Sequence, residues 1–167
     1  MHIGKVVINP GDYNLVASGI GSCLIITLYD SKLRIGALAH SLLPSSVRHD
    51  IASSAPASSG RQGCMTAERT DVKIEDTKYI DVAIDKMLKG LETAGAKRAD
   101  LEAKLIGGAN MFSSFNTDDI GGKNFLSAKD KLKREGIIII GECVGGSQGR
   151  SIEFSPATGV VTVKTKF

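Results

Sequence analysis

The chain has 167 residues, of which 42% are hydrophobic and 23% charged, the balance of a globular domain with its own apolar core. Its net charge of +3 and its 5% aromatic content argue against a basic, aromatic-rich surface for nucleic acid. Cys23, Cys64 and Cys143 are odd in number and have no CxxC spacing. Neither a disulfide framework nor a structural zinc site is therefore indicated.

The chain shows no targeting or membrane signal. No apolar run approaches the roughly 18 residues that a membrane span needs. The first residues lack a cationic region followed by an apolar block, because Asn9-Pro10-Gly11-Asp12 interrupts them. We therefore expect a soluble, cytoplasmic protein whose thiols stay reduced.

Three strands are predicted first, at residues 5–8, 24–29 and 35–39, where short apolar runs are bounded by turn residues. Residues 45–63 are rich in serine and alanine, which predicts a flexible surface loop. The polar residues 70–77 either continue this loop or lead into the next element. We expect the loop at about 45–77.

Two helices are predicted further along the chain. Residues 79–94 carry apolar side chains at i, i+3, i+4 and i+7, the pattern of an amphipathic helix. Asp76 or Thr77 can cap its start, and Gly95 can close its end. The second helix is expected over residues 122–134, with a glycine as terminator.

The remaining strands complete the expected fold. A short strand at 103–106 runs into a glycine pair, which suggests a close backbone approach around a site. The four isoleucines at 137–140 are typical of a strand buried on both faces. Residues 152–154 and 160–164 form a hairpin around a turn. We predict a single α/β or α+β layered domain over the whole chain, with mixed or antiparallel sheets packed against two main helices.

A thiol stands at the front of the second strand, behind the small residues Gly21 and Ser22. Cysteine attacks as a thiolate, and a free pKa of roughly 8.5 leaves little thiolate at neutral pH. A histidine can remove the proton, and His40 ends the strand expected to pair with the one after Cys23. In an antiparallel pair, the start of one strand lies beside the end of the other. The sequence therefore predicts that Cys23 and His40 meet at one edge.

Both residues also have a purely structural interpretation. A lone cysteine is often an inert core residue, and a lone histidine is often a satisfied polar group. His2 and His49 are poorer candidates for a base, since one is near a terminus and the other in a probable loop. The glycine-led turn before Cys23 can direct backbone N–H groups toward an oxyanion, or it can simply form a loop.

Several motifs follow one another along the chain. They are GSC (21–23) with LYD (28–30), GALAHSLLP (36–44), KY (78–79), KLIGGANMF (104–112), GGSQGR (145–150) and TGVVTVK (158–164). Through them, the chain from Val16 to Lys164 resembles the chemoreceptor glutamine deamidase family, CheD.

The resemblance implies an activity and a set of roles. Family members hydrolyse the side-chain amide of selected glutamines on chemoreceptors to glutamate and ammonia. Cys23 would attack the amide carbon while backbone donors of the Gly21-Ser22-Cys23 turn hold the oxyanion. His40 would protonate the departing ammonia and then activate water to release glutamate. No metal or organic cofactor is required.

The chain also departs from the family pattern. Many members have a threonine a few residues before the cysteine as the third polar group of the site, and Ala17 occupies that position here. Ser18 is the adjacent substitute, although strand alternation would point it the other way. Cys143 stands where an acidic residue is expected, and the segment 45–77 is longer than expected.

The resemblance further implies two partners, the cytoplasmic domains of chemoreceptors and a CheC-type chemotaxis phosphatase. Phe112 is a candidate contact for such a partner, with core packing as its alternative. Two other functions remain open. One is a weakly active or inactive docking module that binds CheC or receptors, and the other is a thiol hydrolase with a different amide substrate.

Overall fold

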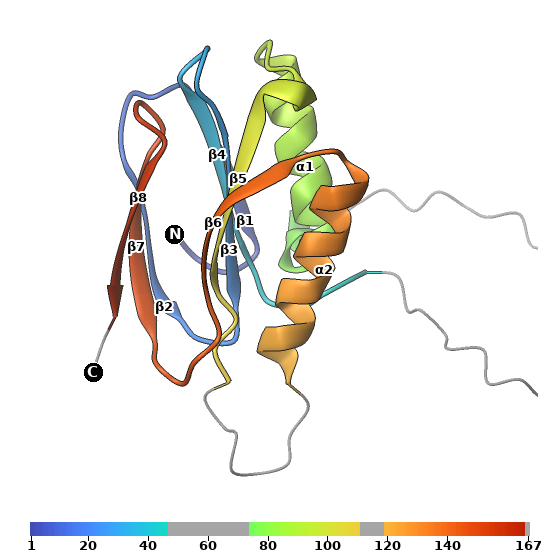
Figure 1. The fold of residues 1–167 in the computed structure, drawn as a ribbon, viewed down its shortest axis with the longest axis vertical. Helices are drawn as coiled ribbons and strands as arrows, with labels where there is room; N and C mark the ends of the chain where they lie inside the picture. Colours follow the sequence, from blue (N-terminus) through green and yellow to red (C-terminus); the bar gives the residue numbers. More distant parts are fainter. Residues whose placement is uncertain (47–73, 111–118, 166–167) are drawn as a thin grey trace, which may run out of the picture.

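The computed structural model describes residues 1–46, 74–110 and 119–165, which form three layers (Figure 1). Two helices, α1 (Ile80–Thr93) and α2 (Ile120–Arg134), cover one face of a five-stranded sheet. A three-stranded sheet packs on the opposite face. This mixed arrangement confirms the predicted fold class. Within the described ranges, neither helix is both long enough and apolar enough to cross a membrane.

The five-stranded sheet has the order β1-β4-β3-β5-β6, in which the β5–β6 pair is parallel and every other pair is antiparallel. The three-stranded sheet, β2-β7-β8, is antiparallel throughout. Two short 3₁₀ helices, η1 (Ile74–Lys78) and η2 (Arg98–Asp100), precede α1 and β5. The strands are β1 (Lys5–Asn9), β2 (Leu15–Ile20), β3 (Leu24–Asp30), β4 (Ile35–Ser41), β5 (Leu101–Gly107), β6 (Ile138–Val144), β7 (Arg150–Ser155) and β8 (Val160–Thr165).

Apolar cores lie on both faces of the central strands. Along β3, Leu24, Ile26 and Leu28 pack toward the helices, whereas Ile25 packs toward the three-stranded sheet. Successive side chains of a strand point to opposite faces, so a strand covered on both sides needs an uninterrupted apolar run. The apolar stripe predicted for the first helix is the buried face of α1, and Gly95 follows that helix with φ 96°.

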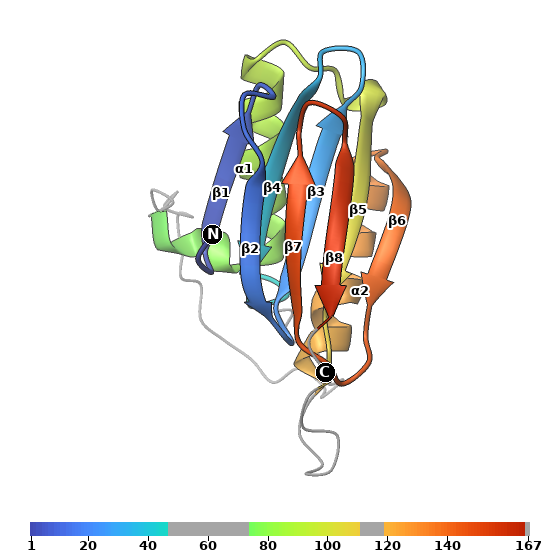
Figure 2. The ribbon, with the colours of Figure 1, turned by 90° about the vertical axis from the view of Figure 1, so that its left-hand side faces the viewer.

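Two expectations about individual elements are wrong. The isoleucine run at 137–140 does not form a doubly buried strand, because β6 is an edge strand on which Ile138 is 70% exposed and Ile140 50% exposed. Figure 2 shows β6 beside the three-stranded sheet and not behind it. Nor does Asp76 or Thr77 cap α1. Both lie in η1, and the N-cap residue of α1 is Tyr79, which makes no side-chain capping bond.

Strand β2 is an element that the sequence did not indicate. Its small residues Ala17, Ser18 and Gly19 are typical of a turn, yet β2 pairs with β7 across a register shift between Ala17 and Ile20. Packing against β7 outweighs the low strand propensity of these residues. Most of the loop expected at 45–77 lies outside the described residues, as does Phe112.

Candidate active site

The two residues expected to form the reactive pair lie at one end of the β3–β4 hairpin. Cys23 immediately precedes β3, and Ile25 pairs with His40 near the end of β4. Ile25 and Leu38 both pack into the core between the sheets. Ile25 and His40 are cross-strand partners and so share this face, and Cys23 lies two residues before Ile25, in the bend that leads into β3. The register therefore brings Cys23 and His40 to the same end of the β3–β4 pair.

His40 is buried, with 2% of its surface exposed. Its Nδ1 lies 3.4 Å from the Met1 carbonyl oxygen, which can only accept a hydrogen bond. This contact favours the tautomer with the proton on Nδ1 and a lone pair on Nε2. Nε2 is buried and has no hydrogen-bond partner among the described residues. The imidazole therefore keeps an unused acceptor inside the molecule.

The surroundings of His40 favour the neutral ring. Burial lowers the pKa of His40 from its usual 6.5. The Met1 carbonyl acts in the opposite direction, whereas the positive charges of the amino terminus and of His2 lower the pKa further. At neutral pH the ring is uncharged and can accept a proton at Nε2.

Cys23 is also largely withdrawn from water, with 7% of its surface exposed, and it is a free thiol. Burial raises its pKa above 9.0, and its own backbone N–H, which interacts with the sulfur, opposes this rise only in part. The thiol is therefore protonated at neutral pH. A protonated thiol and a neutral imidazole are both uncharged, so a reaction at the sulfur would require removal of the thiol proton.

The turn before β3 is held by its carbonyl groups. The Gly21 oxygen accepts a bond of 2.9 Å from the Ala109 N–H, and the Cys23 oxygen one of 2.8 Å from the Gly108 N–H. The Ser22 oxygen accepts a bond of 2.9 Å from Asn124 Nδ2. In a trans peptide, the carbonyl and the following N–H point in opposite directions. The Ser22 and Cys23 N–H groups thus point away from these partners. This direction is the one that donors to an oxyanion require.

The end of β5 approaches this turn closely because Gly107 has no side chain. A Cβ atom at Gly107 would lie 2.3 Å from the Cys23 carbonyl oxygen and 2.7 Å from Cγ2 of Ile20. Its φ of 118° is also one that other residues rarely adopt. The glycine pair expected to permit a close backbone approach does so, at the main chain of Cys23.

The other candidates do not join the pair. Ala17 is fully buried in the core between the sheets, and Ser18 is exposed on the opposite face of β2. Cys143 is half-buried in β6 and packs against that same core. Within the described ranges, no group of three or more His, Cys, Asp or Glu side chains could hold a metal ion.

One residue of the site was not predicted from the sequence. Asn124 of α2 is fully buried and donates to the Ser22 and Leu42 carbonyl oxygens, at 2.9 Å each. The signal was its position on the inward stripe of α2, which Ala128 and Leu132 continue at helical spacing. An asparagine on such a stripe needs buried partners, but the sequence does not say which.

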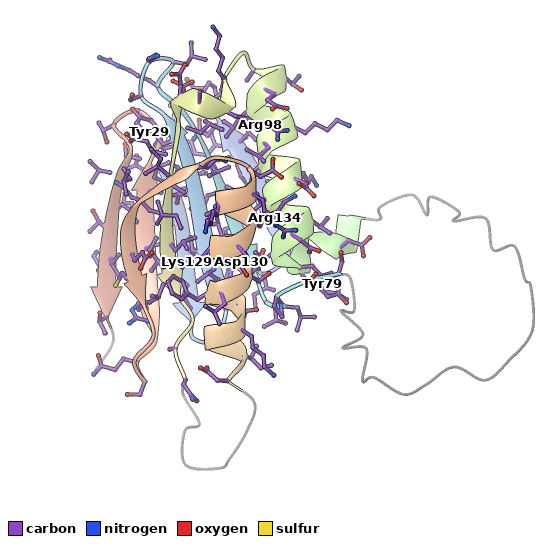
Figure 3. All side chains as sticks on the ribbon, turned by 45° about the vertical axis from the view of Figure 1, so that its right-hand side comes forward. Tyr29, Tyr79, Arg98, Lys129, Asp130 and Arg134 are labelled. Atoms are coloured by element: carbon purple, nitrogen blue, oxygen red, sulfur yellow. The ribbon has the colours of Figure 1, made fainter. Side chains whose placement is uncertain are left out.

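Among the cavities of the described surface are two that α2 borders. One of about 850 Å³ is bounded by α1, α2 and the segment after β4, and its lining mixes charges such as Asp85, Asp130 and Arg134. Figure 3 shows the last two on α2. A smaller one of about 220 Å³ is lined by Gly108 and the β6–β7 turn. Neither is lined by Cys23 or His40, so we assign neither to the reaction.

A thiol, a neutral imidazole and a glycine-led turn at one rim are the features of a cysteine-dependent hydrolase. The family model described as CheD chemotactic sensory transduction matches residues 64–165. The chain belongs to the CheD family.

Similar proteins agree with this assignment. The chain is 36% identical to a chemoreceptor glutamine deamidase CheD of Halalkalibacterium halodurans, over 95% of this chain and 87% of the relative. It is 35% identical to a probable chemoreceptor glutamine deamidase CheD of Pyrococcus abyssi, over 97% and 88% of the two chains. It is 40% identical to a probable chemoreceptor glutamine deamidase CheD 2 of Geobacter metallireducens, over 90% and 82%. The first two matches span almost the whole chain and so include Cys23 and His40, which precede the part matched by the family model.

Proposed function

We propose that this protein is a chemoreceptor glutamine deamidase that uses Cys23 as nucleophile and His40 as general base and acid. The observation that carries the proposal is the strand register, which brings a buried thiol and a buried imidazole with an unused Nε2 to the same end of the β3–β4 pair. The names of its relatives supply the substrate class, a glutamine side chain on a chemoreceptor.

The first half of the reaction forms a thioester. As the sulfur of Cys23 bonds to the amide carbon of the glutamine, Nε2 of His40 takes the thiol proton. The carbonyl oxygen becomes an oxyanion beside the Cys23 and Ser22 N–H groups. The tetrahedral intermediate then breaks its carbon–nitrogen bond, and His40 gives its proton to the nitrogen, which leaves as ammonia.

The second half consumes water. The neutral His40 removes a proton from a water molecule as its oxygen bonds to the thioester carbon. The carbon–sulfur bond breaks, the sulfur regains a proton from His40, and the glutamine has become a glutamate. The same two side chains serve both halves, and the pair returns to its uncharged resting state.

In this chain, a main-chain carbonyl interacts with His40 where many family members have a threonine hydroxyl. Ala17 has no hydroxyl and Ser18 is exposed, so the Met1 carbonyl at 3.4 Å is the group that supports the Nδ1–H tautomer of His40. The absence of a hydroxyl at Ala17 favours a second candidate function. In it, the protein docks to receptors or to a CheC-type phosphatase and turns over little substrate.

One experiment separates the two functions. A chemoreceptor cytoplasmic fragment is incubated with this protein or with its Cys23→Ala variant, and its peptides are analysed by mass spectrometry. Conversion of glutamine to glutamate by the parent protein alone supports the deamidase. Unchanged peptides in both samples, together with measurable binding to the fragment, would support the docking module instead.

The proposed partners follow from this function. The substrate is the cytoplasmic domain of a chemoreceptor, which would place the protein in the cytoplasm. Binding of a CheC-type phosphatase stays a prediction, as does the contact expected of Phe112. A pull-down with purified CheC, using the parent protein and Phe112→Asp, tests both. Equal retention of the two proteins would exclude Phe112 from the contact.

A further inference from the structure

Asn124 joins the two chain segments that carry the reactive pair. Its amide nitrogen donates one hydrogen bond to the carbonyl of Ser22, the residue before the nucleophile. It donates a second to the carbonyl of Leu42, two residues after His40. The bonds are 2.9 Å each, and they come from one planar group that has two N–H donors.

Both acceptors are main-chain carbonyls, and this settles which end of the amide faces them. A carbonyl can only accept, so the nitrogen end of Asn124 must point to Ser22 and Leu42. An aspartate of the same shape could make neither bond and would place negative charge against two oxygens. The interaction therefore depends on the amide and not merely on the volume of the side chain.

The bond to Ser22 acts on the nucleophile through the peptide group. The Ser22 carbonyl and the Cys23 N–H belong to one planar unit, so the direction of one determines that of the other. The Cys23 N–H interacts with the sulfur and lowers the pKa of the thiol. Holding the Ser22 carbonyl thus holds a donor that faces both the sulfur and the expected position of the oxyanion.

The attachment of α2 does not rest on Asn124. Ala128 and Leu132 are fully buried in the core under the helices. Asp119 caps the helix through a 2.9 Å bond from the Gly122 N–H, and the hydroxyl of Ser127 donates to the Pro44 carbonyl. Furthermore, Oδ1 of Asn124 is buried without a hydrogen-bond partner among the described residues, which destabilises the fold. A residue that served only to pack the helix would be better apolar.

We propose that Asn124 is a positioning residue that fixes the Ser22–Cys23 peptide group and ties the nucleophile turn to the end of β4. The proposal deepens the deamidase function and rests on it. The two hydrogen bonds of Asn124 go to main-chain carbonyls and not to the sulfur or the imidazole. It acts through the backbone on either side of them.

The test compares Asn124→Ala and Asn124→Asp with Ser127→Ala, which removes another bond from α2 to the segment after β4. All proteins carry Cys64→Ala and Cys143→Ala, so that Cys23 is the only thiol. Alkylation of Cys23 by iodoacetamide is followed against pH, and kcat and KM for the receptor fragment are measured. Thermal unfolding followed by circular dichroism shows whether each variant is folded.

We expect the two Asn124 variants to titrate their thiol at higher pH than the parent and to lose about 10–100-fold in kcat, because a backbone donor is no longer aligned. KM should change less than threefold, and Ser127→Ala should resemble the parent in every measurement. Equal thiol titrations and kcat values in all proteins would overturn the proposal. So would equal losses in Ser127→Ala, or loss of cooperative unfolding in both Asn124 variants.

The thiol titration keeps this test separate from the proposed function. If the parent protein deamidates no receptor glutamine, the deamidase proposal fails. The alkylation profiles still report whether Asn124 aligns the group beside Cys23. A shift of the alkylation profile in the Asn124 variants, without deamidation by the parent protein, would therefore support the positioning role of Asn124. It would also show that receptor glutamines are not the substrate.

Discussion

Strands β4 and β6 belong to the same sheet, and each contradicts what its composition suggests. The sequence of β4, IGALAHS, contains glycine, histidine and serine, yet all 7 of its residues are buried. The sequence of β6, IIIGECV, begins with three isoleucines, yet Ile138 is 70% exposed. The difference is one of position, because β4 lies between β1 and β3 whereas β6 is at the edge.

This difference affects the environment of His40, which lies in β4. A histidine in a central strand is desolvated from both faces of the sheet, and burial favours its neutral form. The same side chain on β6 would be hydrated and closer to its ordinary pKa. The most covered strand, β4, thus contains a buried histidine, whereas the edge strand β6 carries exposed apolar side chains such as Ile138.

The largest expected effect is a difference in kcat between a variant in β4 and a variant in β6. His40→Ala in β4 should lower kcat by roughly 10²–10⁴-fold, the usual contribution of a general base. Ile140→Thr in β6 should leave kcat within twofold, because Ile140 is half-exposed and distant in sheet order from the pair. Deamidation of a receptor fragment, followed by mass spectrometry, measures both. Equal activities in the two variants would remove His40 from the reaction.

A second contrast uses two glycines that both have a positive φ. Gly107→Ala should destabilise the fold by several kcal/mol, about 3 or more, since its Cβ would lie 2.3 Å from the Cys23 oxygen. Gly136, just before β6, has φ 73° and no heavy atom within 4 Å of its would-be Cβ. Gly136→Ala should cost only about 1–2 kcal/mol.

Urea unfolding measures both free energies. If Gly107→Ala were no more destabilising than Gly136→Ala, the close approach of β5 to the nucleophile turn would be disproved.

A third contrast tests burial itself. Leu38→Ala removes a fully buried side chain of β4 and should lower the free energy of unfolding by about 2–5 kcal/mol. Ile138→Ala in β6 should lower it by about 0.5 kcal/mol or less. Differential scanning calorimetry of the two variants provides the comparison. Similar losses of stability would mean that β6 is covered in the protein.

The smallest expected effect concerns Ser18, the residue predicted from the sequence as the third polar group of the site. Because Ser18 is exposed on the outer face of β2, Ser18→Ala should leave kcat and KM within twofold of the parent values. Steady-state kinetics on the receptor fragment test this expectation. A large drop in kcat would restore Ser18 as the group that orients His40.

Local patterns made part of this structure predictable. Cys23 immediately precedes β3, His40 lies in β4, and a short turn joins the two strands, so sequence spacing predicts that both residues come to one end of the hairpin. The apolar period of α1 is local in the same way. In each case the interacting residues are close along the chain, and few alternative pairings compete.

The features that could not be predicted depend on distant contacts. Asn124 bonds to Ser22 and Leu42, which lie 102 and 82 residues away in the sequence. No local sequence pattern predicts such distant partners. The exposure of β6 follows from strand order, which its isoleucines do not encode. Strand β2 forms because β7 pairs with it, although its own small residues favour a turn.

The most direct test of the neutral thiol–imidazole pair is the pH dependence of kcat/KM for receptor glutamines. The titratable groups near His40 include the amino terminus, His2 and Lys5, and Lys5 pairs with His40 from β1. Since burial lowers the pKa of His40 and raises the pKa of the Cys23 thiol, kcat/KM should rise with a midpoint below pH 6.5 and then stay level through neutral and mildly alkaline pH. In His40→Asn this rise should vanish. A bell-shaped profile that declines between pH 7 and 9 would instead reveal a thiolate–imidazolium pair and contradict the account.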